Sequence, residues 1–296
     1  VGLYWSASGQ VQRENIVSGL PGMSTLEFPL QAFDLEIDGQ SLHTRWDVTA
    51  SGSRAGARPG TREAVLELRH QLRPFAVKVI TRVDGTPFLA RRLEITNLGK
   101  KPAALARVSP WSGLLWTWKR NEHWGEQPPV STGAFRLGYF DSLRQGSEGN
   151  FRWETLPPGW RRIEGTNGHS GFGNPFFLLR NEMTGESAVL SLAWSGNWCA
   201  EFWSDPFRDL SNQPERGMNL GFRMGPAGPA PLRVIEPGET LATPETHLGV
   251  VHGGMEETVG AWHGHLRASV IPPRPKGKEF YTLAGRVVEE KGTWIH

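Results

Sequence analysis

The sequence predicts an all-β fold, made mainly of antiparallel strands, with a single helix near the C-terminal end. Apolar and polar residues alternate with a period of two in several short segments, such as residues 33–38. This period buries one face of a strand and leaves the other in water, as in antiparallel sheets. Turn pairs such as Asp38-Gly39 and Asp84-Gly85 follow these segments and indicate hairpins.

The composition agrees with a strand-rich globular protein. The 296 residues include 36 Gly and 22 Pro, enough for many tight turns but below the content typical of disorder. Hydrophobic residues make up 38% and charged residues 21%, so a buried core is expected. The 13 tryptophans suit both core packing and stacking on sugar rings.

Charge and cysteine content exclude several classes of function. The formal net charge is only +2 and no basic run occurs, so we expect no nucleic-acid partner. No apolar run reaches 18 residues, so we expect no membrane partner. Cys199 is the single cysteine, which excludes an internal disulfide. With no signal-peptide pattern at Val1, a cytoplasmic location is favoured.

The remaining segments complete the expected order of elements. Residues 187–194 and 219–224 are expected as later strands, whereas residues 109–135 and 157–176 are less regular and are expected as long loops. Residues 51–62, rich in Ser, Gly, Arg and Pro, are expected as a mobile loop.

The expected helix covers residues 254–270. Met255, Val259, Trp262, Leu266 and Val270 lie three or four residues apart, and they form one apolar stripe. A proline-rich segment then ends the helix. We therefore divide the chain into a sandwich domain (1–253), a terminal linker helix (254–270) and a tail (271–296).

Several short motifs in this order resemble glycoside hydrolase family 36 α-galactosidases. They include residues 91–99 (RRLEITNLG), 168–170 (GHS), 174–176 (NPF), 194–198 (WSGNW) and 243–245 (TPE). The resemblance runs from about residue 1 to the helix near residue 270, and it is to the N-terminal domain of that family.

The resemblance implies a two-layer β-supersandwich of the galactose mutarotase-like kind. In the family this domain precedes a (β/α)₈ barrel that carries two catalytic aspartates, and a helix joins the two. No strand–helix alternation follows Pro275, so no catalytic residue is carried over to this chain. The implied role is support of a barrel, oligomer contacts and one wall of a galactoside cleft.

Residues 194–203 hold the most informative aromatic cluster. Trp194 and Trp198 share strand parity, so both rings face one side of a regular strand, and Trp203 follows. Asn197 carries the donor and acceptor that sugar hydroxyls need. A sugar-facing surface and a core position both remain open for these tryptophans.

His169 and Asn174 lie in a Gly- and Asn-rich loop and complete the candidate carbohydrate-binding or cleft-facing residues. His169 with Glu201 would suit the acid/base chemistry of an aldose epimerase, and a loop histidine bonded to backbone is the alternative. The other candidate carboxylates are Glu154, Asp205 and Asp209, for which surface or turn positions are the plainer interpretation.

Three functions therefore stay open: a non-catalytic galactosidase domain, a stand-alone carbohydrate-binding module, and an aldose epimerase-like enzyme. Exposure of Trp198 and Trp203 would favour the module. No cofactor and no metal are expected, because His263 and His265 point to different sides of the helix. For Arg91 and Arg92 we expect one solvated side chain and one paired with a glutamate.

Overall fold

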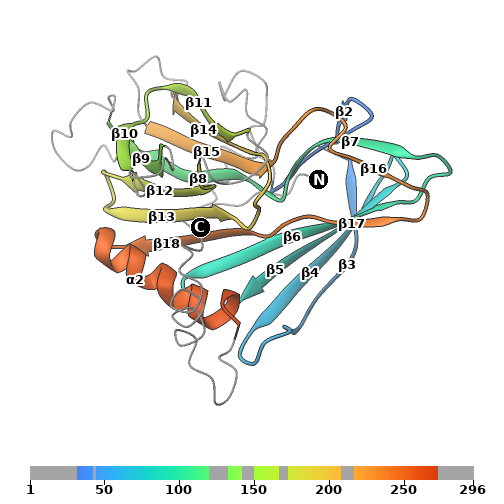
Figure 1. The fold of residues 1–296 in the computed structure, drawn as a ribbon, viewed down its shortest axis with the longest axis horizontal. Coiled ribbons are helices and arrows are strands. Elements are labelled where there is room, and N and C mark those ends of the chain that lie inside the picture. The colour runs from blue at the N-terminus through green and yellow to red at the C-terminus, as the bar shows by residue number, and fades with distance from the viewer. Residues whose placement is uncertain are drawn as a thin grey trace, which may run out of the picture.

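The residues that the structure describes form three antiparallel sheets and one helix, which continues into a π-helical turn (Figure 1). The computed structural model describes residues 32–42, 45–119, 133–141, 150–166, 173–207 and 217–272. For residues 117–119, 205–207 and 217–219 it describes the backbone alone. The predicted, mainly antiparallel all-β class is confirmed, and the predicted C-terminal helix is present in the described residues.

The largest sheet has ten strands. Its order is β10-β9-β12-β13-β18-β6-β5-β4-β3, and β17 also pairs with β6. The strands are β3 (Trp46–Ala55), β4 (Arg62–His70), β5 (Phe75–Val83), β6 (Phe88–Asn97), β9 (Phe135–Phe140), β10 (Phe151–Thr155), β12 (Phe176–Asn181), β13 (Glu186–Leu192), β17 (Thr240–Ala242) and β18 (Thr246–His252).

Two four-stranded sheets pack on one face of the large sheet. One has the order β11-β14-β15-β8 and covers its β10–β13 half. The other has the order β16-β7-β1-β2 and covers its β5–β4 half. Their strands are β1 (Asp34–Ile37), β2 (Gln40–Ser41), β7 (Ala103–Ser109), β8 (Trp111–Lys119), β11 (Gly159–Gly165), β14 (Trp198–Phe207), β15 (Gly217–Pro226) and β16 (Arg233–Ile235).

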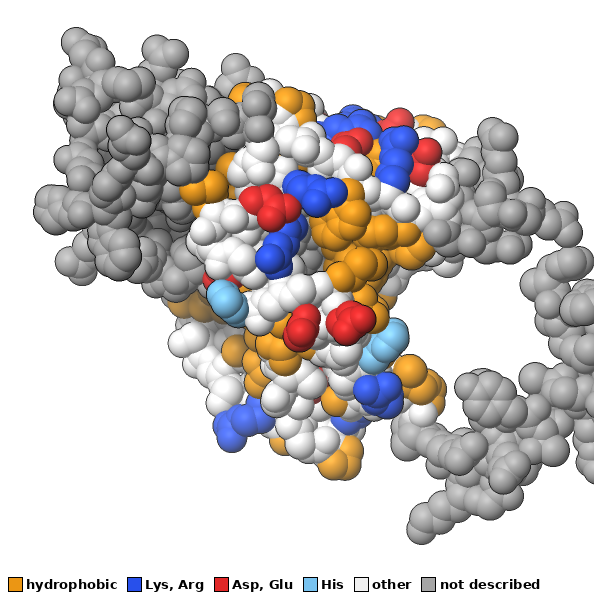
Figure 2. Space-filling view, turned by 90° about the vertical axis from the view of Figure 1, so that its left-hand side faces the viewer, with side chains coloured by type: hydrophobic (Ala, Val, Ile, Leu, Met, Phe, Trp, Pro, Cys, Tyr) orange, Lys and Arg blue, Asp and Glu red, His pale blue; other side chains and the backbone are white. Residues whose placement is uncertain are grey.

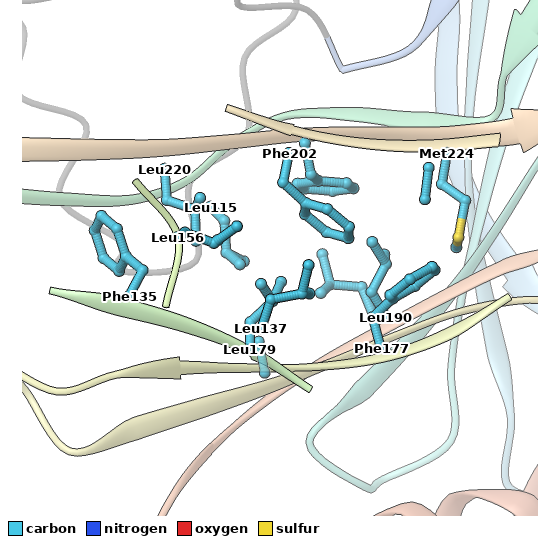
Figure 3. Close-up of a cluster of buried hydrophobic side chains, with 14 of the residues drawn as sticks. Leu115, Phe135, Leu137, Leu156, Phe177, Leu179, Leu190, Phe202, Leu220 and Met224 are labelled. Carbon is cyan, nitrogen blue, oxygen red and sulfur yellow. The ribbon is translucent and has the colours of Figure 1, made fainter. Parts of the chain in front are cut away.

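Each small sheet encloses its own hydrophobic core. In the first, Phe202, Leu220 and Met224 point from β14 and β15 toward Phe177 and Leu190 of the large sheet (Figure 3). All five side chains are fully buried. Burying a side chain of this size contributes roughly 1.5–3 kcal/mol, so this layer is a major source of stability.

The second core lies between the β1–β7 sheet and strands β4 to β6, and it includes Leu35, Ile37, Val77 and Ile95. The small sheets meet where Gly225 of β15 crosses β7. A Cβ atom on Gly225 would lie 1.9 Å from the Val108 carbonyl oxygen, so only glycine allows this approach.

The hairpin between β1 and β2 turns at Asp38 and Gly39, as the sequence predicts. Both residues have positive φ, 52° and 72°, which matches a two-residue type I′ turn.

The helix α2 (Met255–His265) continues into a π-helical turn, η2 (Leu266–Val270), on the other face of the large sheet. The apolar stripe of the helix is only partly buried: Trp262 packs against the sheet beside Phe88, but the fully buried positions are others. Met255 is 50% exposed, whereas the polar residues Thr258, His265 and Ser269 are the buried ones. These positions are tolerated because their polar groups hydrogen-bond locally or to the sheet.

Three expected loops contain strands instead. Residues 51–55 belong to β3, because pairing with β4 outweighs their Ser/Gly-rich composition. The segments 109–135 and 157–176 contain β8 and β11, whose tryptophans and small residues fit the layer over the first core.

Candidate functional site

The most connected polar cluster lies between α2 and the large sheet. Asp84 comes from the β5–β6 turn, His247 from β18 and His265 from the last turn of α2. His265 Nδ1 lies 2.6 Å from Asp84 Oδ2, and His265 Nε2 lies 2.8 Å from His247 Nδ1. Both histidines are almost completely buried, at 1% and 3% exposure. We call these three residues the helix joint.

The pKa shifts indicate that both histidines of the helix joint are neutral near pH 7. Burial lowers the pKa of His247 to about 3. Burial also lowers the pKa of His265, although Asp84 acts in the opposite direction. Burial acts to raise the pKa of Asp84, but hydrogen bonds from Thr86 and neighbouring groups outweigh it and the net shift is downward. An ionised Asp84 accepting from a neutral His265, which accepts from His247, satisfies every short contact.

The helix joint does not have the geometry of a nucleophilic triad. Ser269 Oγ lies 3.4 Å from His265 Nδ1, the same nitrogen that bonds Asp84. A triad needs the serine on the other ring nitrogen, and His247 occupies that nitrogen here. Ser269 is also buried, at 3% exposure. The arrangement therefore fixes the helix and does not expose a reactive hydroxyl.

A ladder of ion pairs continues from the helix joint across the same face of the sheet. Glu245 lies 2.7 Å from Arg82 and 3.4 Å from Arg92, and Arg92 lies 3.1 Å from Glu63. Glu63 in turn bonds Arg54 at 2.7 Å. This ladder links the residue just before β18 with strands β5, β6, β4 and β3 beside the helix.

Two arginines bind the carbonyl groups at the end of the helix. Arg58 donates to the Val270 and Ile271 oxygens at 2.8 and 2.7 Å, and Arg82 donates to the Ser269 oxygen at 3.3 Å. The last carbonyls of a helix lack intrahelical partners and carry partial negative charge, so cations stabilise them. The two arginines thus fix the end of the helix against the large sheet.

The tryptophans predicted as a sugar platform do not lie on one surface. Trp194 is 43% exposed and lies in the turn between β13 and β14, whereas Trp198 and Trp203 are buried at 1% and 5%. The shared strand parity predicted for Trp194 and Trp198 is wrong, because β13 ends at Leu192 and β14 starts at Trp198. Burial of Trp198 and Trp203 counts against the binding module.

The Trp194 indole stabilises that turn. Its Nε1 donates to the Asn197 carbonyl oxygen at 2.9 Å. A Cβ atom on Gly196 would lie 2.9 Å from the same Nε1, so glycine makes room for the ring. The Asn197 oxygen also accepts from the Ala227 N–H at 3.0 Å. The WSGNW motif is therefore a turn held by its own Trp194 and by Ala227, which follows β15.

The other candidates lie apart. Asn174 is half-buried just before β12, and its carbonyl oxygen accepts from Phe176 N at 2.7 Å. His169 lies outside the described residues, as does Asp209, and the side chain of Asp205 is not described.

The two described carboxylates are bound by arginines. Glu154 pairs with Arg161 and Glu201 pairs with Arg223. Arg161 lies opposite Phe202, a core residue, whereas Glu201 is the residue before Phe202 and so faces the outer side of the same sheet. Glu154 and Glu201 therefore belong to separate ion pairs and not to a shared acid/base site.

Arg91 corrects the prediction for the arginine pair. Arg92 is ion-paired with glutamates, as predicted, but Arg91 is buried and not solvated. Its guanidinium lies 4.1 Å from the Trp111 ring, and its Nε donates to Thr81 Oγ1 at 3.0 Å. Burial lowers the pKa of Arg91 to about 10, so it stays charged at neutral pH.

A pocket of about 260 Å³ lies where the first turn of α2 meets the large sheet. It is lined by Trp153 and by charged groups that already contact neighbours: Arg180 donates to Ser187 Oγ at 3.0 Å, and Arg136 lies 3.7 Å from Glu182. Hydrophobic, acidic and basic side chains are mixed at this end of the molecule (Figure 2). No area of one charge dominates that face.

Within the described ranges, no group of three or more His, Cys, Asp and Glu side chains has the arrangement of a metal site. The helix found in those ranges is too short to cross a lipid bilayer.

Sequence reasoning missed the helix joint. Asp84-Gly85 was identifiable as a turn, and His265 lay off the apolar stripe. A second helical pattern in the sequence could have indicated it: Thr258, Trp262, His265 and Ser269 are spaced by four, three and four residues and therefore share one face of the helix.

No protein-family model matches the sequence, and a search of curated proteins also found no match. Solved structures do match. AgaB, a glycoside hydrolase family 36 α-galactosidase from Geobacillus stearothermophilus, aligns with a TM-score of 0.62 and 17% identity over 86% of this chain and 34% of its own. An AgaA variant from the same organism, in complex with raffinose, gives 0.59 and 17% over 83% and 33%.

An α-galactosidase from Lactobacillus brevis gives a TM-score of 0.58 and 16% identity over 81% of this chain and 32% of its own. At such identities the likeness is one of fold. This chain has the fold of part of these family 36 enzymes and spans about a third of their length. That share is consistent with the N-terminal domain that the sequence resembles.

Proposed function

We propose that this chain is the non-catalytic sandwich domain of an α-galactosidase of the family 36 kind. It supports a catalytic barrel, contributes oligomer contacts and forms one wall of a galactoside cleft. The observation that carries the proposal is the match to one third of several such enzymes over more than 80% of this chain.

The helix joint supports the same proposal. A domain that positions a neighbour needs a rigid connection to it, because loose connections leave relative domain motion as the default. Here the helix is bound to the sheet through Asp84, His247 and His265, and its last carbonyls are bound through Arg58 and Arg82. The C-terminal end of the helix is thereby held at a defined place relative to the large sheet.

The carboxylates are consistent with a role outside bond cleavage. Retaining glycosidases need two carboxyl groups about 5–5.5 Å apart, one of them a free nucleophile. Glu154 and Glu201 are each bound to arginine, and Glu154 has its pKa lowered because hydrogen bonds from Arg161 and Tyr139 outweigh burial. A lowered pKa opposes the protonation that an acid catalyst needs.

The test is hydrolysis of a nitrophenyl α-galactoside by the purified 296-residue chain. We expect no release of nitrophenol above that of buffer. Turnover that disappears on Glu201→Gln or Glu154→Gln would contradict the proposal, because it would place the chemistry within this chain. A folded control comes from circular dichroism of the same samples.

A further inference from the structure

The strand β3 is the outermost strand of the ten-stranded sheet, and its outer edge pairs with no other strand in the part of the chain that the structure describes (Figure 1). Its inner edge pairs with β4 along its whole length, from Trp46↔His70 to Ala55↔Arg62. Nine of its ten residues are exposed, so water covers both of its faces.

A long strand in this position is costly to order. Fixing the backbone costs about 1–2 kcal/mol per residue, and exposed residues return little of it through burial. Edge strands in natural proteins are usually short or covered, because a free row of N–H and C=O groups is a template for pairing with another chain. A ten-residue strand with nine exposed residues therefore points to a partner that completes the edge.

We propose that β3 pairs antiparallel with β3 of a second copy of this chain. In such a pair the two-fold axis is perpendicular to the sheet, so residues that lie opposite each other must share a face. Asp47 and Arg54 meet this condition. Asp47 pairs with Arg69 of β4, and Arg54 pairs with Glu63. These partners are six residues apart, an even number, so they lie on one face of the sheet. Asp47 and Arg54 are seven residues apart but share that face, because the irregularity between Val48 and Ala50 takes one residue out of the alternation.

A register centred on Ser51 makes the strand self-complementary. Ser51, opposite Leu66 of β4, lies midway between Asp47 and Arg54 in this count. Asp47 of each copy then faces Arg54 of the other, giving two opposite-charge pairs. Both residues are exposed, and Arg54 can bond a second carboxylate beside Glu63 because its guanidinium has five N–H donors.

The side chains near the axis leave room for this contact. Ser51 faces Ser51 of the second copy, Gly52 faces Ala50, and Ser53 faces Val48, which is 53% exposed in the single chain. All are small or β-branched and uncharged, so no like charges meet at the centre. This contact deepens the proposed function, because it names the strand that makes the oligomer contacts. It rests on β3 alone and does not depend on the activity of the protein.

Cysteine cross-linking tests the register in the full chain. Residues directly opposite in an antiparallel pair have Cα atoms about 4.5–5.5 Å apart, within disulfide range. Ser51→Cys is therefore expected to form a covalent dimer with oxidised glutathione. Ser53→Cys is the matched control: it is on the same face but two residues off the axis, so its two copies lie more than about 13 Å apart. The unsubstituted chain, with Cys199 alone, should stay uncross-linked.

Charge substitutions at the centre of the contact provide a second test, which does not depend on disulfide formation. Ser51→Lys and Ser51→Glu each place like charges opposite each other, and each should raise the dimer dissociation constant about tenfold or more in sedimentation equilibrium. A 1:1 mixture of the two variants should restore the dimer. Ser195→Lys, an exposed serine in the β13–β14 turn, should leave the dissociation constant unchanged.

A chain that stays monomeric over the whole concentration series would overturn the proposal, as would cross-linking of Ser53→Cys equal to that of Ser51→Cys. Both measurements report only the oligomeric state of the chain. The galactosidase relationship is tested by turnover, so failure of one proposal is distinguishable from failure of the other.

Discussion

At the scale of single residues, we expect the stability of the fold to depend most on the contact between Asp84 and His265. Replacing His265 by Ala removes the partner of Asp84 Oδ2 and of His247 Nδ1, whereas Asp84 Oδ1 keeps its bonds from Thr86. Leaving a buried polar group without its partner costs about 1–3 kcal/mol, and more when the group is charged. We expect the free energy of unfolding, measured in urea, to fall by about that amount.

His263 provides the control for this prediction. It lies on the same helix two residues earlier and is exposed, so His263→Ala should change the free energy of unfolding by less than about 0.5 kcal/mol. Equal losses for the two variants would show that helix propensity, and not the helix joint, determines the effect.

The histidines of the helix joint predict how stability depends on pH. Burial lowers the pKa of both, with His247 at about 3, so the unfolded chain binds their protons more tightly than the folded chain. The stability from the neutral histidines is therefore complete above about pH 6.5 and is lost as pH falls toward the folded pKa. We expect the unfolding free energy to fall between pH 6.5 and 5 by up to about 1.4 kcal/mol per pH unit for each histidine.

His247→Gln removes one of these titrations, so its slope over the same pH range should be smaller than that of the unsubstituted chain. Asp84 and other carboxylates with lowered pKa values also lose stability in acid, but only near and below pH 4. A slope unchanged by His247→Gln would contradict the assignment.

Residue-scale prediction from sequence was limited by tertiary context. The alternation on β6 showed that Arg91 and Arg92 face opposite sides, but only the fold places Trp111 over Arg91 and Glu245 beside Arg92. The sequence also left open which side of the sheet Trp194 and Trp198 face, because that depends on where each strand starts. The turn at Trp194 changed the parity that a continuous strand would have given.

At the scale of elements, the end of the helix is the feature to test. Arg58 donates to the oxygens of Val270 and Ile271, and its loss removes two charge-assisted hydrogen bonds. We expect Arg58→Ala to speed hydrogen exchange of amides in η2 and of Ile271, whose N–H donates to Leu266 O.

Arg62→Ala is the matched control, because Arg62 is exposed and bonds Ser53 at the start of β4. Its exchange pattern in η2 should equal that of the unsubstituted chain. Faster exchange in both variants would show that the loop between β3 and β4, and not the Arg58 contact, governs the helix end.

Elements with a clear local pattern were predicted, and elements held by pairing were not. The β1–β2 hairpin follows from Asp38-Gly39, and the helix from its spacing of apolar residues. Residues 51–55 of β3 and the segment that holds β8 were expected as loops, because they lack a regular alternation and become strands only through pairing with β4 and β15. The buried polar residues of α2 were not predicted, because they depend on bonds to Asp84 and to the helix backbone.

At the scale of the whole molecule, one broad sheet is covered on one face by two small sheets and on part of the other face by a helix (Figure 1). The predicted fold class and the resemblance to family 36 galactosidases were both confirmed at the level of fold. The residues chosen as a sugar site remain a prediction, since the aromatic set divides between a turn and the core.

The central claim is that this fold serves a catalytic domain that it does not itself contain. The most direct measurement is the sequence of the reading frame beyond His296 in the source genome. The account predicts an alternating strand–helix pattern, roughly twice as long as this chain, because the chain matches about a third of the related enzymes. A stop codon directly after His296, together with galactoside hydrolysis by the 296-residue chain, would contradict it.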